Sequence, residues 1–149
     1  MDALDRKILA VLQGNARASL QEVGQAVGLS SSPCWERIRK LEQAGVIEGY
    51  TVRLNAQALG LGDTVMVQVT LDSHTDNTLE KFGETLAAIP EVIEAYLVSG
   101  EYDYLLRVAV KDTRDYERLL RERLYKIKGI RHSKSSFVLR TLKKADLPL

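Results

Sequence analysis

Cysteine and histidine are scarce in this sequence. Its 149 residues include one cysteine, Cys34, and two histidines, His74 and His132. A single cysteine excludes a disulfide within the chain, and these three residues lack the close spacing of a metal site. Both histidines are expected to be surface residues. We therefore expect neither a metal nor a cofactor.

Long apolar runs are also missing. No uncharged apolar stretch approaches the roughly 18 residues that a membrane span needs. The first residues carry Asp2 and Asp5 where a signal peptide would begin its apolar segment. The sequence therefore predicts a cytoplasmic protein without a membrane partner.

An excess of charge of either sign is absent, because 21 Lys and Arg face 20 Asp and Glu, a net charge of +1. Nucleic-acid-binding proteins usually have an excess of basic residues, so the total alone disfavours DNA. The distribution is uneven, however: residues 1–55, 56–112 and 113–149 carry net charges of +1, −7 and +7. Blocks of opposite charge favour contacts within the chain or between its copies.

Three short helices are predicted in the first 45 residues. Leu4, Ile8 and Val11 have the spacing of a buried helical face, behind a cap at Asp2. A second helix begins with the capping box Ser19-Leu20-Gln21-Glu22 and ends at Gly28; a third runs from about Ser30 to Gly45. Two helices joined by a tight turn and supported by a first helix form a helix-turn-helix, whose second helix enters the major groove of DNA. Residues 46–54 alternate enough to predict a strand, a small wing.

The third helix has two contrasting faces. Cys34, Ile38 and Leu41 share the predicted core side, and polar side chains lie opposite. Base edges would be contacted by Arg39 or Glu36 and phosphates by Ser31, Ser32, Arg37 and Lys40, with Trp35 near the edge of this face. Two other interpretations are open: the helix is an ordinary amphipathic one with a solvated face, and Trp35 completes a small core. Cys34 is expected to be a buried apolar residue rather than a redox sensor.

The rest of the chain alternates between strand and helix patterns. After a linker at residues 55–63, strands are predicted at 64–71, 91–98, 102–110 and 131–142, and helices from an Asn77–Glu80 capping box to Pro90 and over 113–128. The order β-α-β-β-α-β is that of the ferredoxin-like fold. The sequence therefore predicts an α+β protein with domains at 1–54 and 64–149. Both faces of the sheet look apolar, so a second subunit is expected to cover the one that the helices leave open.

Several motifs resemble those of a known family: Leu4-Asp5-Arg6-Lys7-Ile8-Leu9, Gly28-Leu29-Ser30-Ser31-Ser32-Pro33-Cys34, Arg37-Ile38-Arg39-Lys40-Leu41-Glu42, Gly45-Val46-Ile47 and Ser99-Gly100-Glu101-Tyr102-Asp103-Tyr104-Leu105-Leu106. They are similar to the Lrp/AsnC family, the feast/famine transcriptional regulators, over essentially the whole chain. The resemblance implies an N-terminal winged helix-turn-helix and a C-terminal ferredoxin-like domain (ACT-like, RAM) that senses amino acids and forms dimers, often octamers.

The resemblance also implies an effector site between dimers, lined by the turn before the third strand of the C-terminal domain. Here that turn is Ser99 to Asp103, in which Gly100 permits close approach, Tyr102 offers a ring and a hydroxyl, and Asp103 can pair with an α-ammonium group. Ser133 and Ser135 on the last strand replace the family's more usual threonines. Alternatively, Gly100 serves only the turn, and Asp103 pairs with a basic residue of the last charge block.

The expected function is therefore sequence-specific binding of double-stranded DNA, controlled by a small effector, an amino acid by resemblance, in a homo-oligomer. Two alternatives remain. Sirohaem decarboxylases, which are enzymes, are similar to this two-domain architecture. Such an enzyme would need cationic and histidine side chains around the cleft, and the two scattered histidines of this sequence disfavour it. A sensor or assembly module that no longer binds DNA is disfavoured by Arg39 and Lys40 on the outer face of the third helix.

Overall fold

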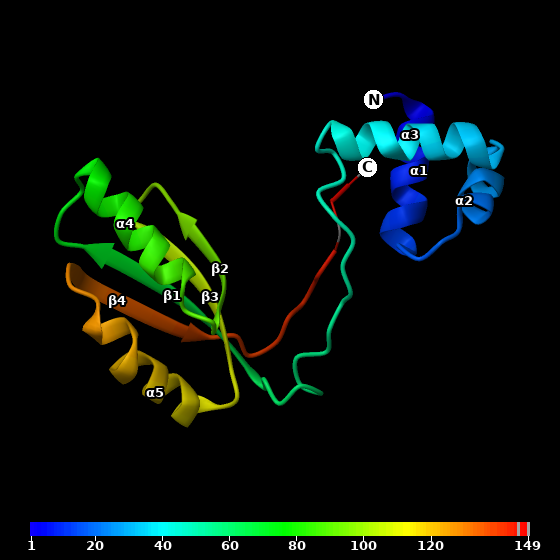
Figure 1. Cartoon of the computed structure of the whole chain (residues 1–149). Coiled ribbons are helices and arrows are strands. Elements are labelled where there is room, and N and C mark those ends of the chain that lie inside the picture. The colour runs from blue at the N-terminus through cyan, green and yellow to red at the C-terminus, as the bar shows by residue number, and fades with distance from the viewer. Residues whose placement is uncertain (146, 149) are drawn as a thin grey trace. The chain divides into compact units, whose positions relative to one another are not determined.

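The chain folds into two units. The computed structural model describes residues 1–145, 147 and 148, and its internal contacts group Met1–Arg53 with Lys143–Leu149, and Leu54–Leu142 by themselves. Three helices make up most of the first unit, and the second contains a sheet with two helices (Figure 1). The division differs from the expected domains at the C-terminus, because the last segment packs with the N-terminal unit: the side chain of Gln13 donates to the carbonyl of Leu147 over 3.1 Å.

The first unit contains α1 (Ala3–Gly14), α2 (Leu20–Val27) and α3 (Ser31–Gln43). Two of them begin at the predicted caps: the capping box of Ser19 with Glu22 starts α2, and Asp2 caps α1, where Asp5 also makes the cap reciprocal, which was not predicted. In each cap a side chain accepts a bond from a backbone N–H that has no acceptor inside the helix, which is why these starts can be read from sequence.

The turn between α2 and α3 is held by two glycines. Gly28 has φ 76°, the left-handed conformation that glycine adopts at little cost. Gly24 lies inside α2, where an added Cβ would stand 2.5 Å from the carbonyl oxygen of Leu29. The backbone of α2 therefore approaches the turn too closely for a side chain at this position, and α3 leaves the turn from a fixed place.

The predicted wing is wrong: the described residues 46–54 contain no strand. Val46, Tyr50, Val52 and Leu54 are all exposed. A strand is stable only when a neighbouring strand accepts and donates its backbone hydrogen bonds, and alternation of apolar residues does not supply that neighbour.

The second unit confirms the ferredoxin-like order. Its elements are β1 (Asp63–Leu71), α4 (Asp76–Ala87), β2 (Val92–Leu97), β3 (Tyr104–Val110), α5 (Thr113–Glu122), the 3₁₀ turn η1 (Leu124–Lys126) and β4 (Ile130–Phe137). The antiparallel sheet has the order β2-β3-β1-β4, and α4 and α5 cover one of its faces (Figure 1).

The core of this unit lies between the sheet and its two helices. Every second residue of β1 and β3 is buried there against Phe82 and Leu86 of α4 and Tyr116 and Leu119 of α5. The opposite face is mixed rather than apolar as predicted, because the pair Arg107–Glu94 lies on it beside apolar residues such as Met66 and Leu105. Within the described residues, no helix is long and apolar enough to cross a membrane.

Three predicted boundaries are wrong. Thr75, not Asn77, is the N-cap of α4, so the Asn77–Glu80 capping box does not start it. The helix predicted to reach residue 128 ends at Glu122 and continues as η1. The last strand ends at Phe137 rather than 142, because its partner β1 begins at Asp63 and the final bond runs from Val138 N–H to Thr64 O, 2.9 Å.

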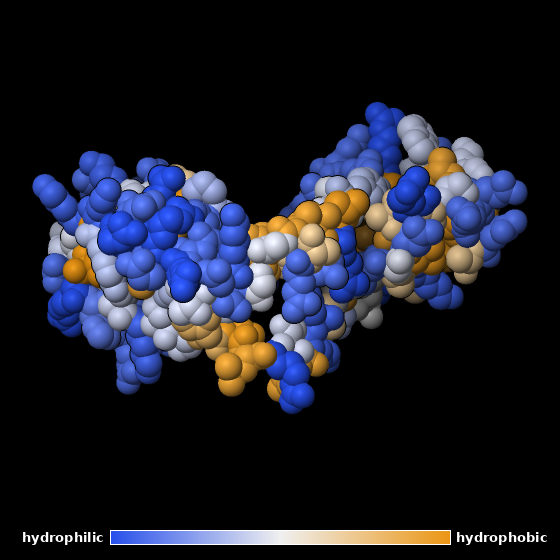
Figure 2. Space-filling view, turned by 90° about the horizontal axis from the view of Figure 1, so that it is seen from below, coloured by the Kyte–Doolittle hydropathy of each residue, from blue (hydrophilic) through white to orange (hydrophobic). Residues whose placement is uncertain are grey.

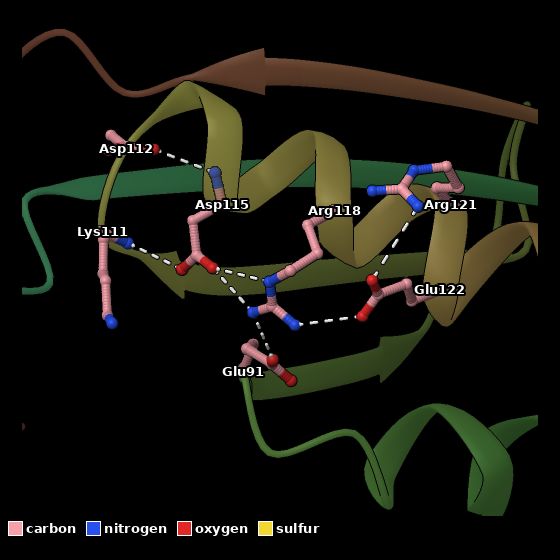
Figure 3. A network of polar contacts seen from close by, with 7 residues as sticks. All are labelled: Glu91, Lys111, Asp112, Asp115, Arg118, Arg121 and Glu122. Carbon is pink, nitrogen blue, oxygen red and sulfur yellow. Dashed lines mark hydrogen bonds and ion pairs between the residues drawn. The ribbon is translucent and has the colours of Figure 1, made fainter.

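Charged side chains on α5 form a network that reaches β2 (Figure 3). Arg118 donates to Asp115 at 2.6 Å, to Glu122 at 3.4 Å and to Glu91, just before β2, at 3.5 Å. The contact with Glu91 joins the acidic middle block of the sequence to the basic last block. Hydrophilic residues such as these cover most of the surface that Figure 2 displays, with smaller apolar areas between them.

Candidate functional site

The two faces of α3 are separated as predicted. Cys34, Ile38 and Leu41 are buried. The candidate DNA-binding residues on the other side are exposed: Ser31, Ser32, Trp35, Glu36, Arg39 and Lys40. Burial raises the pKa of the Cys34 thiol, which keeps it protonated and unreactive, in agreement with an apolar role rather than redox sensing. The helix therefore presents one continuous polar face.

Trp35 lies on this polar face and does not complete the core, since it is 47% exposed. The guanidinium carbon of Arg39, one turn further along, lies 5.3 Å from the centroid of the Trp35 rings. This is the geometry of a cation–π contact, which restricts the orientations that the long arginine side chain can take. Two exposed residues that looked independent in the sequence thus form a unit.

Arg37 is the member of the predicted set that the structure places differently. Its Nη1 donates to Asp2 and to Asp5 of the α1 cap, each over 2.7 Å. A bond from the Asp5 amide, together with the Arg37 side chain, lowers the pKa of Asp2 below its ordinary value. Arg37 thus joins α3 to the start of α1, and its phosphate contact stays a prediction.

The predicted effector turn connects β2 to β3. Ser99 and Gly100 are exposed, Gly100 has φ 127°, and Tyr102 is half-buried. The N–H of Val98 donates to the carbonyl of Asp103 over 2.9 Å and closes the turn. Four of the six predicted effector-binding residues therefore lie together.

The Asp103 carboxylate has two partners that the sequence did not predict. One oxygen accepts from the N–H of Leu71 at 2.7 Å, and the other is 2.9 Å from Nε2 of His74. Leu71 is the last residue of β1, and His74 lies in the segment after it. The alternative of a basic partner for Asp103 from the last charge block is therefore wrong. The β1–β3 register explains this contact. It pairs Val69 with Tyr104, and so brings the end of β1 beside Asp103.

Ser133 and Ser135 are on β4, on the other side of β1 from the turn. They lie opposite Val69 and Val67, and Ser135 Oγ is 2.5 Å from the hydroxyl of Tyr116. Within one chain, the width of β1 separates the two serines from Asp103.

A shallow groove of about 560 Å³ runs between α4 and β2 and was not predicted. It is lined by Leu79, Glu80, Gly83, Glu84, Ala87, Ala95, Leu97 and Tyr104. Because the lining is mostly apolar with two carboxylates at its side, the groove adds no phosphate or metal site. Among the residues that the structure describes, no three or more His, Cys, Asp or Glu side chains form a group able to hold a metal ion.

Comparison with known proteins shows which families have this arrangement. Residues 1–42 match the AsnC-type helix-turn-helix domain, and residues 64–148 match the Lrp/AsnC ligand binding domain. The leucine-responsive regulatory proteins of Klebsiella pneumoniae and Escherichia coli (strain K12) are each 38% identical over 146 residues, 98% of this chain and 89% of theirs.

Solved structures of transcriptional regulators have the same fold as this chain. An AsnC family transcriptional regulator from Agrobacterium tumefaciens has a TM-score of 0.94 at 39% identity, with 99% of this chain and 97% of that one covered. A transcriptional regulator from Neisseria meningitidis, crystallised as a complex with L-Met, has a TM-score of 0.93 at 34% identity, covering 99% and 96%. These relatives are named as regulators and not as enzymes.

Proposed function

Because this chain belongs to the Lrp/AsnC family of transcriptional regulators, we propose that α3 reads specific sites in double-stranded DNA and that the second unit makes this binding depend on an amino acid. The observation that carries the proposal is the continuous exposed polar face of α3 opposite a fully buried one.

In this proposal α3 lies in the major groove. Arg39 and Glu36 contact base edges, and Ser31, Ser32 and Lys40 contact phosphates, where the amide groups of the first helical turn also favour an anion. Trp35 orients Arg39 by the cation–π contact. Arg37 sets the angle between α3 and α1 through Asp2 and Asp5.

The replacement Arg39→Ala tests the reading face. We expect the affinity for a site selected from random DNA to fall about 5- to 150-fold at physiological salt, the effect of losing one good base contact. Fluorescence anisotropy with labelled duplex measures it. Arg6→Ala, at an exposed arginine of α1, is the matched control and should bind as the unaltered protein does. Unchanged affinity of Arg39→Ala would remove Arg39 from the interface.

The second part of the proposal concerns the effector. An amino acid would place its ammonium group on Asp103 and its remaining atoms along Ser99, Gly100 and Tyr102, with Ser133 and Ser135 supplied by a neighbouring copy. Support comes from the family's ligand binding domain and from the neighbour crystallised with L-Met.

Asp103→Asn is a sharper test than alanine, because an amide oxygen can still accept the N–H of Leu71 while the negative charge is lost. We expect the thermal stabilisation by L-methionine or L-leucine to disappear and DNA binding without effector to persist. Glu101→Gln, in the same turn, is the control for loss of charge alone. A full response in Asp103→Asn would contradict the assignment.

The assembly completes the mechanism. We propose a cytoplasmic dimer, extended to octamers, whose paired α3 helices meet major grooves one helical turn, about 34 Å, apart. An effector bound between copies would change their association, and with it DNA affinity, by a coupling on the order of 1–3 kcal/mol.

A further inference from the structure

We propose that His74 belongs to the effector site and that, without effector, its imidazole occupies the Asp103 oxygen that the ammonium group takes when an amino acid binds. The inference rests on the proposed function, since it assumes that Asp103 meets the ammonium group. The inference adds a residue from outside the β2–β3 turn. It also makes effector binding an exchange of partners on the Asp103 carboxylate.

The carboxylate of Asp103 is only 17% exposed, and His74 is its outer partner. Leu71 N–H holds one oxygen from the end of β1, whereas His74, itself 56% exposed, is 2.9 Å from the other oxygen. A ligand arriving from solvent therefore finds one oxygen taken by the backbone and the second covered by a side chain that can move into water.

Asp103 keeps its orientation without His74. Its backbone N–H donates to Val69 O and its carbonyl accepts from Val98 N–H, both at 2.9 Å, and Leu71 fixes one carboxylate oxygen. These three bonds are independent of the imidazole. Removing the imidazole should expose the second oxygen rather than disorder the carboxylate.

The segment that carries His74 can release it without unfolding its neighbours. Asp72 N–H is anchored to Gly129 O at 2.9 Å on one side, and Thr75 is the N-cap of α4 on the other. Both bonds go to the Asp103 carboxylate, but the exchange replaces the imidazole by a ligand ammonium group, which brings a full positive charge and three N–H donors. The imidazole thus lowers the apparent affinity for an amino acid, because its own bond to Asp103 must break before the ammonium group can bind there.

His74→Ala provides the test, with L-methionine and L-leucine as probes and isothermal titration calorimetry as the measurement. We expect binding about 2- to 12-fold tighter than in the unaltered protein, the range that follows from removing one competing hydrogen bond of ordinary strength. His132→Ala is the matched control, because His132 is exposed on β4 opposite Thr70 and should leave affinity unchanged. Unchanged or weaker binding in His74→Ala overturns the proposal.

A second measurement uses the unaltered protein. The chain has two histidines, so NMR resolves their imidazole signals, and His132→Ala assigns them. Adding the amino acid should shift the His74 signals toward those of a solvated imidazole and leave those of His132 in place. Static His74 signals at saturation would contradict the exchange.

The outcomes separate this inference from the function on which it rests. If no amino acid binds, both fail. If Asp103→Asn abolishes binding while His74→Ala does not tighten it, only the role of His74 fails.

Discussion

Arg37 illustrates how much of the site is decided by single side chains. Its position on α3, beside Arg39 and Lys40, is typical of a phosphate contact, but its guanidinium is held by Asp2 and Asp5. The same two carboxylates cap α1, so one arginine ties the reading helix to the first helix of the unit.

The pH dependence of stability should reveal this contact. Because the pKa of Asp2 is lower in the folded state, its favourable contribution is present at neutral pH and is lost as the pH falls through that lowered pKa, below the ordinary value of 3.8. Arg37→Ala should therefore lower the unfolding midpoint more at pH 7 than near pH 2. Circular dichroism during heating measures both; an equal loss at the two pH values would contradict the ion pair.

These residue contacts explain why the sequence predicted the site incompletely. Arg37 meets carboxylates 32 and 35 positions away, and His74 meets Asp103 across 29 positions. Periodicity places a side chain on a face of its own helix, but it does not say which other segment faces it. The exposed residues of α3, which depend only on helical periodicity, were predicted correctly.

The elements of the fold depend on a few places where two backbone segments come close together. The clearest is Gly24 in α2, which lies against the carbonyl of Leu29. A methyl group there would meet the Leu29 carbonyl, a backbone atom that cannot move aside without shifting the turn. The sequence offered only a glycine within a helix pattern, which by itself indicates a weak helix.

Gly24→Ala should therefore both destabilise the first unit and weaken DNA binding, because α3 starts from the displaced turn. Gly14→Ala is the control: it is the last residue of α1, and an added Cβ there meets nothing within 4 Å. Thermal unfolding and anisotropy measure the two effects. A Gly24→Ala protein as stable as Gly14→Ala would mean that the turn adapts freely.

The Tyr116–Ser135 contact tests another element, the packing of α5 on β4. Burial raises the pKa of Tyr116, and Ser135 is its hydroxyl partner. Ser135→Ala should cost about 0.5–1.5 kcal/mol of unfolding free energy, the usual net value of a hydrogen bond. Ser136→Ala, at the neighbouring exposed position of β4, is the control. Chemical unfolding measures both, and equal stability of the two variants would contradict a structural role.

Local signals predicted the elements well where the chain itself closes the bonds. The caps at Asp2 and Ser19 and the turn at Gly28 need only neighbouring residues. The ends of β4 and the absence of a strand at 46–54 depend instead on whether another strand lies alongside, which no local pattern specifies.

For the whole molecule, charge distribution and assembly belong together. The contact between Arg118 and Glu91 satisfies part of the opposite charge of the last two blocks within one chain. Charged side chains of the two blocks that face solvent can also act between copies, which a total of +1 conceals.

Light scattering should therefore give a mass of at least two chains of 16.7 kDa each at micromolar concentration. If charge complementarity joins dimers, added salt should lower the mass in steps toward two chains because it screens exposed charges. A mass of one chain under all conditions would contradict the proposed assembly.

The return of the C-terminal segment to the first unit has a practical consequence. The two ends of the chain belong to the same body, where Gln13 contacts Leu147. Fluorophores attached at positions 13 and 147 would therefore remain close as long as that body is intact, and energy transfer between them would report its unfolding. A probe of the second unit would need to be placed within residues 54–142, because positions 13 and 147 both belong to the first unit.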